Sequence, residues 1–143
     1  MTTGSCSCRY IRYTITNPPH KLVNCHCTEC RKLSGAPYQT FAHFQTSHIK
    51  WTTEPPTARS SSPAAVRTFC PRCGSSISMA YRAFPDLLGI AAGTVDWPED
   101  GGGGSDGGWG VVRPSCHIFL REKAGWFEVP GDGLERYEGH FFG

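Results

Sequence analysis

The chain has 143 residues, a formal net charge of +2, a hydrophobic content of 38% and an aromatic content of 12%. This length suffices for one domain with a real core, and the small net charge argues against a strong nucleic-acid binder. No apolar run approaches the roughly 20 residues that cross a bilayer, and the N-terminus lacks the features of a secretory signal. We therefore expect no membrane association and a cytoplasmic location, where thiols stay reduced, and the sequence leaves a homo-oligomer open.

The expected elements are mostly short strands, because 17 glycines and 11 prolines disfavour long helices. Alternating patterns rich in aromatic and β-branched residues, or short apolar runs, predict strands at 9–15, 21–24, 38–44, 48–51, 66–69, 76–81, 87–92, 117–120 and 126–129. One helical turn is expected at 28–33, ended by Ser34, Gly35 and Pro37. The sequence therefore predicts a mainly β protein.

Two segments are expected to be loops. Residues 53–65 are rich in Pro, Ser and Thr and carry no packing signal. Residues 99–108 include four consecutive glycines and predict a flexible loop. No Lys-Ser/Thr pair follows these glycines, so a phosphate-binding loop is disfavoured. Without an internal repeat or a convincing boundary, we expect a single domain over 1–143.

The eight cysteines form a pattern typical of metal binding: Cys6-x-Cys8, Cys25-x-Cys27-x-x-Cys30, Cys70-x-x-Cys73 and a lone Cys116. Two thiols one residue apart on an extended strand face the same side, because side chains alternate along a strand. That arrangement suits two bonds to one ion, whereas a disulfide needs a specific separation and dihedral angle. Spacing and the expected reducing compartment therefore favour zinc over a disulfide framework.

A first zinc site is predicted from two half-sites. Cys70 and Cys73 supply two ligands, and Gly74 suits the tight turn that aims backbone amides at the sulfurs. Cys6 and Cys8 supply two more, which completes the four ligands of a closed structural zinc. Such a site would clamp the N-terminal strand to the middle of the chain.

The second predicted site, Cys25, Cys27 and Cys30, has three ligands and an open position, the general signature of a catalytic zinc. Three thiolates make zinc a weak Lewis acid, poorly suited to generating hydroxide from water. The site is better suited to a further soft ligand, such as a substrate thiol that loses its proton on binding. The alternative is a closed four-cysteine zinc completed by Cys116, which is otherwise a buried apolar residue.

Three residues near this second site are candidates for substrate binding. Arg31 and Lys32 follow it directly, either as a solvated surface pair or as partners for a substrate carboxylate. His26 lies between two ligands and points to the opposite face of an extended backbone, so it is expected to hydrogen-bond or contact substrate rather than bind the zinc. The remaining histidines, His20, His43, His48, His117 and His140, are expected to be surface or packing residues.

Several segments together resemble one known family. They are Gly4-Ser5-Cys6-Ser7-Cys8, the run from Asn24 to Ala36, Phe69-Cys70-Pro71-Arg72-Cys73-Gly74-Ser75, Gly93-Thr94-Val95-Asp96, His117-Ile118-Phe119 and Ala124-Gly125-Trp126-Phe127. From about Gly4 to about Tyr137 the chain resembles the glutathione-dependent formaldehyde-activating enzyme family, which also includes centromere protein V. The resemblance implies a zinc-bearing domain of stacked, folded antiparallel sheets with few short helical turns.

The resemblance also implies two zinc ions. A structural zinc would use Cys6, Cys8, Cys70 and Cys73. A catalytic zinc, which we expect to be the labile one, would use Cys25, Cys27 and Cys30. The segment at 99–108 resembles an insertion that would remodel a substrate-facing edge.

The implied activity is carbon–sulfur lyase chemistry run in reverse, in which glutathione and formaldehyde give S-hydroxymethylglutathione. The expected partner is thus a small-molecule thiol such as glutathione. Two alternatives stay open: a family member acting on another glutathione conjugate in specialised metabolism, and a non-catalytic zinc-binding interaction module.

Overall fold

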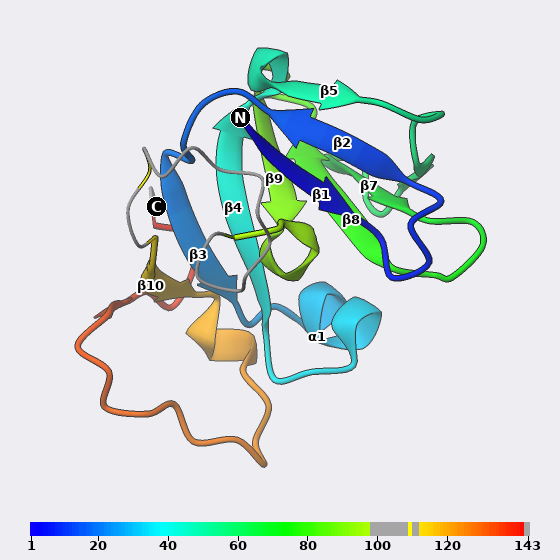
Figure 1. Ribbon diagram of the computed structural model, residues 1–143. Coiled ribbons are helices and arrows are strands. Elements are labelled where there is room, and N and C mark those ends of the chain that lie inside the picture. The colour runs from blue at the N-terminus through cyan, green and yellow to red at the C-terminus, as the bar shows by residue number, and fades with distance from the viewer. Residues whose placement is uncertain (98–108, 110–111, 142–143) are drawn as a thin grey trace.

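The computed structural model describes residues 1–97, 109 and 112–141, and these form two β-sheets and one α-helix (Figure 1). The smaller sheet has three antiparallel strands in the order β1-β2-β5, which span Thr2–Ser5, Arg12–Ile15 and Ile49–Trp51. The larger sheet has eight strands in the order β11-β10-β3-β4-β9-β8-β7-β6. The mainly β class expected from the sequence is confirmed.

The strands of the larger sheet are β3 (Lys21–Cys25), β4 (Gln39–Gln45), β6 (Thr57–Ser60), β7 (Ala65–Phe69), β8 (Ser76–Tyr81), β9 (Leu87–Ala91), β10 (Pro114–Ile118) and β11 (Glu135–Arg136). Neighbours from β3 to β6 pair antiparallel, whereas β10 lies parallel to both β3 and β11. The parallel pairs differ from the antiparallel sheets expected, because β10 arrives by a long connection rather than a hairpin.

The helix α1 spans Thr28–Ser34, close to the helical turn that the sequence predicts. Gly35 ends it in a left-handed conformation (φ 68°), and its amide donates to the Arg31 carbonyl. Single-turn 3-10 helices lie at Thr46–His48, Ala92–Thr94 and Leu120–Glu122. No helix among the described residues is long and apolar enough to span a membrane.

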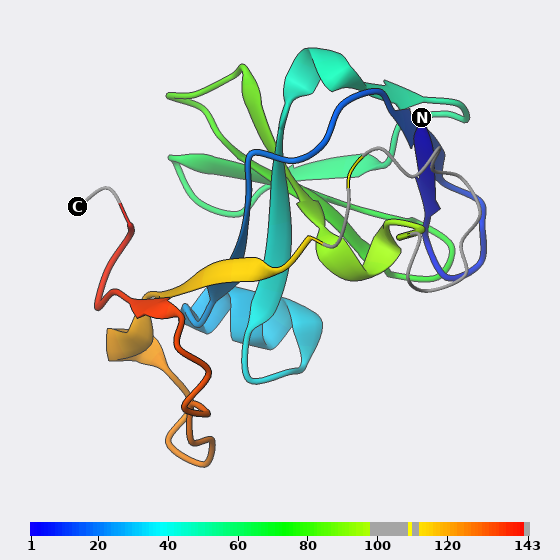
Figure 2. The ribbon, with the colours of Figure 1, turned by 60° about the vertical axis from the view of Figure 1, so that its left-hand side comes forward.

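The larger sheet has a hydrophobic cluster on each face, because its central strands are apolar at successive positions. Leu22, Ala42 and Phe44 join Tyr13 and Ile15 of the smaller sheet in one cluster. On the opposite face, neighbours of those residues pack in a second cluster with the helix and β10: Val23, Cys25, Cys30, Phe41, Ala65, Met79, Cys116 and Ile118. Figures 1 and 2 show the small sheet lying to one side of the large one, with α1 near the C-terminal end of β3.

Two expectations in the first half of the chain are wrong: the start of the strand at 9–15 and the loop at 53–65. Residues 9–11 belong to a turn, with Arg9 at φ 66°, so β2 starts only at Arg12. The expected loop 53–65 contains β6, which pairs with β7 at the sheet edge. All four β6 side chains are exposed, so its backbone pairs without a hydrophobic pattern that the sequence could reveal.

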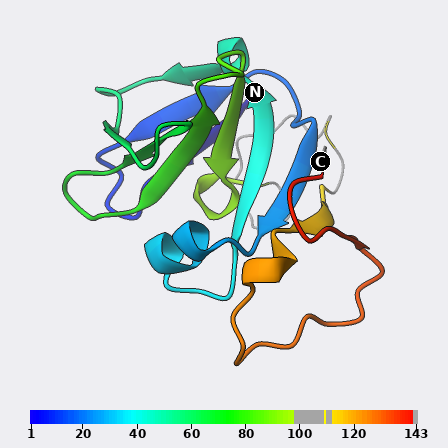
Figure 3. The same ribbon diagram turned by 180° about the vertical axis from the view of Figure 1, so that it is seen from behind.

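Two further expectations near the C-terminus are also wrong. The strand expected at 117–120 lies at Pro114–Ile118 and stops at Phe119, whose φ of 57° is left-handed. Residues 126–129 form no strand, and Trp126 is 74% exposed. Figure 3 shows this stretch after Glu122 running outside the sheets before the chain returns to β11. The expected loop at 99–108 lies outside the described residues.

The first prediction concerns Gly4, which pairs with Tyr13 across β1 and β2. A Cβ atom at Gly4 would overlap the Tyr13 ring, which is 1% exposed and tied by its hydroxyl to Thr94 Oγ1 at 2.7 Å. We expect Gly4→Ala to lower the free energy of unfolding by about 1–3 kcal/mol, measured by urea denaturation. Gly125→Ala is the control, because a Cβ atom added at Gly125 would have no atom within 4 Å. Equal stability of the two variants would contradict this packing.

The second prediction concerns the pH dependence of stability. Burial, followed by the charges of His140, Lys21 and His20, lowers the pKa of His43 to about 4. Between pH 6.5 and 4 the unfolded chain therefore binds a proton at His43 that the folded chain does not, so the free energy of unfolding falls as the pH drops. We expect His43→Gln to show a smaller loss between pH 7 and pH 5 by urea denaturation. An unchanged pH dependence would show that His43 contributes nothing.

Candidate metal centres

Cys6, Cys8, Cys70 and Cys73 bring their four sulfur atoms within 4.8 Å of one another. The Cys8 sulfur lies 3.6 Å from that of Cys6 and 3.8 Å from that of Cys70, and all four are free thiols. A tetrahedral zinc with bonds of about 2.3 Å to sulfur needs sulfur–sulfur separations of about 3.8 Å. The donor set and its spacing therefore fit a closed metal site.

Two similar turns present these sulfurs. In the first, the Ile11 amide donates to Cys6 Sγ at 3.3 Å. In the second, the amides of Arg72 and Cys73 donate to Cys70 Sγ at 3.4 and 3.5 Å, and Gly74 adopts a φ of 79°. Amide donors favour the ionised thiolate over the thiol.

The expected strand geometry of the Cys6–Cys8 pair is wrong. β1 ends at Ser5, and the pair lies in the following turn, where the Arg9 amide donates to the Cys6 carbonyl at 3.1 Å. A turn brings both sulfurs together as well as a strand face would, so the grouping survives although its geometric reason changes.

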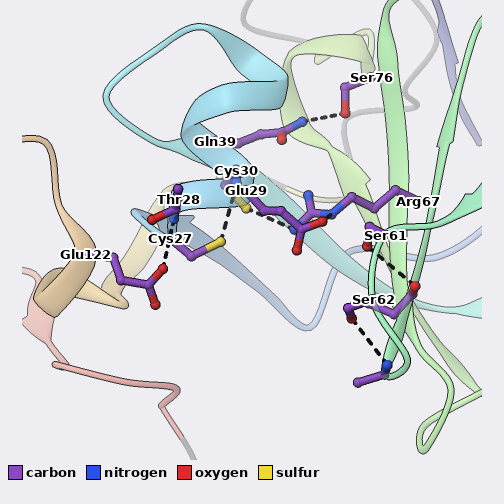
Figure 4. A network of polar contacts seen from close by, with 12 residues as sticks. Cys27, Thr28, Glu29, Cys30, Gln39, Ser61, Ser62, Arg67, Ser76 and Glu122 are labelled. Atoms are coloured by element: carbon purple, nitrogen blue, oxygen red, sulfur yellow. Dashed lines mark hydrogen bonds and ion pairs between the residues drawn. The ribbon is translucent and has the colours of Figure 1, made fainter.

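Cys25, Cys27 and Cys30 form the second set, again with sulfurs within 4.8 Å of one another. Cys25 ends β3, Cys27 is the N-cap of α1, and Cys30 lies inside the helix. The Cys27 sulfur accepts from the Cys30 amide at 3.3 Å, as Figure 4 shows. Hydrogen bonds from the Cys25 and Cys30 thiols, followed by this amide, hold the pKa of Cys27 well below its usual value. Cys27 is therefore the member of the set that most favours the thiolate form.

Cys116 lies outside this second set. It is fully buried on β10, opposite Val23 of β3 rather than opposite Cys25, and no metal-binding group of the described residues includes its sulfur. Burial raises the pKa of its thiol, as expected for a cysteine that packs as an apolar residue. The geometry favours an open three-thiolate site.

Arg67 is the residue beside this site that the sequence analysis missed. It is 7% exposed on β7, and its Nη2 donates to Cys30 Sγ at 3.4 Å (Figure 4). Its Nε lies 3.9 Å from Glu29 Oε1. Burial opposes the charged form, but Cys30 and Glu29 raise the pKa of Arg67 above its usual value. The sequence did carry one signal for it, because Arg67 is a charged residue within the strand predicted at 66–69.

A chain of hydrogen-bonded side chains adjoins the second set, with His26 and His117 buried and Asp132 exposed. His26 Nε2 and His117 Nδ1 are 2.8 Å apart, and His117 Nε2 is 2.8 Å from Asp132 Oδ2. The His26 amide also donates to the Ile118 carbonyl at 2.9 Å. His117 was expected to be a surface or packing residue, and these hydrogen bonds were not predicted. They fix the backbone between Cys25 and Cys27 against β10.

A pocket of about 530 Å³ opens beside the second set. It is lined by Cys27, Thr28, Glu29, Lys32, Leu33, Arg59, Ser62, Ala65, Arg67, Met79, Tyr81, Phe119 and Glu122. Of the residues expected to bind substrate, Lys32 lines this pocket, whereas Arg31 and His26 are not among its lining residues. Lys32 and Arg59 are exposed, so both cations remain available to a ligand.

The third prediction separates the two readings of Cys116. We expect Cys116→Ser to keep the metal content of the parent protein, because its sulfur belongs to neither set. Cys30→Ser should lose one metal equivalent, because it removes a thiol from the set of three. Both contents are measured by native mass spectrometry after purification with zinc. Loss of metal in Cys116→Ser would show that Cys116 closes the second site.

The comparisons with known proteins point to one family. The family model described as "Glutathione-dependent formaldehyde-activating enzyme" matches residues 1–122. A Halomonas elongata protein named "Putative glutathione-dependent formaldehyde-activating enzyme" is 26% identical over 93% of this chain and 83% of its own length. An uncharacterized lyase of Schizosaccharomyces pombe is 32% identical over 54% of this chain and 56% of its own length.

One solved structure supports the fold. A crystal structure of a Rhodobacter sphaeroides protein superposes with a TM-score of 0.56 at 20% identity. The match covers 77% of this chain and 96% of the other, so the two proteins share most of the β architecture.

Proposed function

Because the chain belongs to the glutathione-dependent formaldehyde-activating enzyme family, we propose that it is a zinc-dependent enzyme that forms or cleaves a carbon–sulfur bond. The proposed substrate is the adduct of glutathione, or a related thiol, with an aldehyde, as in S-hydroxymethylglutathione formation. A lyase-type reaction agrees with the names of the Halomonas and Schizosaccharomyces relatives. We place this enzyme in the cytoplasm as a single domain over 1–143.

The observation that carries the proposal is the position of Cys27 in the wall of the 530 Å³ pocket. The three-cysteine set therefore faces a space large enough for a small molecule, whereas the four-cysteine set already has the ligand number of a closed site. A zinc bound by Cys25, Cys27 and Cys30 would supply a soft Lewis acid that favours the thiolate form of a substrate thiol.

Other residues of the pocket would bind the substrate and enclose it. Lys32 and Arg59 supply positive charge at its exposed rim, where they would bind the carboxylates of glutathione. Met79 and Tyr81 on β8 supply an apolar wall that would limit water around the reacting atoms. Holding the sulfur and the carbonyl carbon side by side converts a bimolecular addition into an effectively unimolecular one.

The four-cysteine set takes no part in the proposed reaction. We assign it a structural zinc, because one of its turns follows β1 and the other connects β7 to β8, so a metal between them would link these segments. Cys6 and Cys70 are buried with Ile11 and Ile77, so this metal would sit against a small hydrophobic cluster of its own.

The fourth prediction tests the proposed thiol site directly. In protein loaded with Co²⁺, glutathione should change the sulfur-to-cobalt absorption, because its thiolate would join the three cysteine sulfurs. We expect Cys30→Ser, which should lose the metal of this site, to abolish the absorption change and to lower glutathione affinity by at least tenfold in calorimetry. The matched control, Cys116→Ser, should bind as the parent protein does.

The same titration decides between an enzyme and a binding module. Two inert metal sites with no response to glutathione or to other thiols would identify a non-catalytic zinc module. A response to a different thiol conjugate, but not to glutathione, would retain the thiol site and reassign its substrate.

A further inference from the structure

We propose that Arg67 is a catalytic residue that binds the carbonyl oxygen of the aldehyde and the alkoxide into which it is converted. The inference rests on the proposed function, because it requires a substrate thiolate beside Cys25, Cys27 and Cys30. It names the group that receives the oxygen, which neither the cysteine pattern nor the family match assigns.

Arg67 is buried and has hydrogen-bond donors that no described residue accepts. It is 7% exposed, and only Nη2 makes a hydrogen bond, to Cys30 Sγ at 3.4 Å. Nη1 and Nε make none with any described residue, although Glu29 Oε1 lies 3.9 Å from Nε. Buried donors in folded proteins almost always have partners, so these two call for an acceptor that the free chain does not provide.

Arg67 itself adjoins the pocket, on the side of the second sulfur set. Arg67 and Cys27 both line the pocket, and Figure 4 shows the Arg67 side chain reaching from β7 toward Cys30 and Glu29. The guanidinium therefore lies where a ligand held by its sulfur would place its nearest atoms. In the adduct of a thiol with an aldehyde, a single carbon atom separates oxygen from sulfur.

The number of bonds between the sulfur and each acceptor indicates that the partner of Arg67 is the aldehyde oxygen rather than a carboxylate of glutathione. The carboxylates of glutathione lie many bonds from its sulfur, and the exposed Lys32 and Arg59 are better placed to bind them. Arg67 is instead buried against Cys30, opposite Met79 in the β7–β8 pairing. A donor preorganised in a water-poor site favours the charge that develops on an oxygen during reaction.

A purely structural role explains only part of this geometry. Three thiolates exceed the charge of one zinc ion by one unit, and the Arg67 cation would offset that excess. Charge compensation accounts for the bond from Nη2 to Cys30 and for the 3.9 Å ion pair of Nε with Glu29, but it leaves Nη1 without a partner and Nε without a hydrogen bond among the described residues.

The proposed step balances as a simple addition. The thiolate sulfur forms a bond to the carbonyl carbon, and the π electron pair of the carbonyl moves to oxygen, which becomes an alkoxide hydrogen-bonded to Arg67. Water then donates a proton to the alkoxide, and the hydroxide that remains takes up the proton that the thiol released. In the reverse direction, Arg67 stabilises the same alkoxide while the carbon–sulfur bond breaks.

The fifth prediction compares Arg67→Met and Arg67→Lys with the control Arg82→Met, which removes an exposed arginine that hydrogen-bonds Ser60. Rates of adduct formation from formaldehyde are measured above the uncatalysed background, with glutathione and with 2-mercaptoethanol, a thiol that lacks carboxylates. We expect Arg67→Met to lower kcat about 100-fold with both thiols. Glutathione affinity, read from Co²⁺ absorption, should change by less than about threefold.

Three outcomes would overturn the inference. A loss confined to glutathione, with 2-mercaptoethanol unaffected, would make Arg67 a carboxylate-binding residue. Full recovery of both metal content and kcat in Arg67→Lys would make it a charge compensator, because lysine restores the charge without the fork of donors. An unchanged kcat in Arg67→Met would remove it from the reaction.

These results are distinguishable from failure of the proposed function. If wild-type protein loaded with Co²⁺ does not respond to glutathione or 2-mercaptoethanol, the thiol site itself is wrong. If it responds and Arg67→Met retains full kcat, only the role of Arg67 is wrong. Should Arg67→Met fail to fold, Arg67→Lys carries the test, because a lysine that restores metal binding but leaves kcat at least tenfold low supports the oxygen contact.

Discussion

The meeting of two cysteine-bearing turns is the contact on which the architecture depends. Cys8 and Cys70 are 62 positions apart in the chain, yet their sulfur atoms lie 3.8 Å from each other. The hydrophobic cluster at this junction is small, with Cys6, Ile11, Cys70 and Ile77 as its buried members. Four ionised thiols at such separations repel one another unless a cation lies between them. A metal ion at this junction would therefore offset the repulsion and close a long loop at the same time.

The chemistry of the second site depends on a different long-range contact, the parallel pairing of β10 with β3. This pairing sets Ile118 opposite Cys25 and brings His117 within hydrogen-bonding distance of His26. Asp132 then binds the far side of the His117 ring. The loop that carries two of the three thiols is thus held from behind by side chains that do not reach the pocket. Ordered support of this kind would keep the three sulfurs in place if they hold a metal ion.

Local patterns predicted the parts of the fold that depend on local chemistry. The strand at 76–81 and the helix ended by Gly35 were predicted closely, because period and capping are encoded nearby in sequence. The edge strand β6 was not, since its exposed side chains carry no pattern. The site divides in the same way. The spacing of the cysteines predicted both sulfur sets, whereas Arg67 approaches Cys30 from 37 positions away, and only the pairing of distant strands could reveal it.

The two sulfur sets share no residue and lie in separate hydrophobic clusters. Selection can therefore act on one without the other. Replacing the three thiols near the pocket would leave the junction of the two sheets intact, and the remaining fold could acquire a new ligand in the same pocket. Loss of a thiol from the set of four would weaken this junction, which would then depend on the packing of Tyr13 and Ile15 against Leu22, Ala42 and Phe44. The separation of the two centres thus predicts descendants that keep four cysteines and have exchanged the other three.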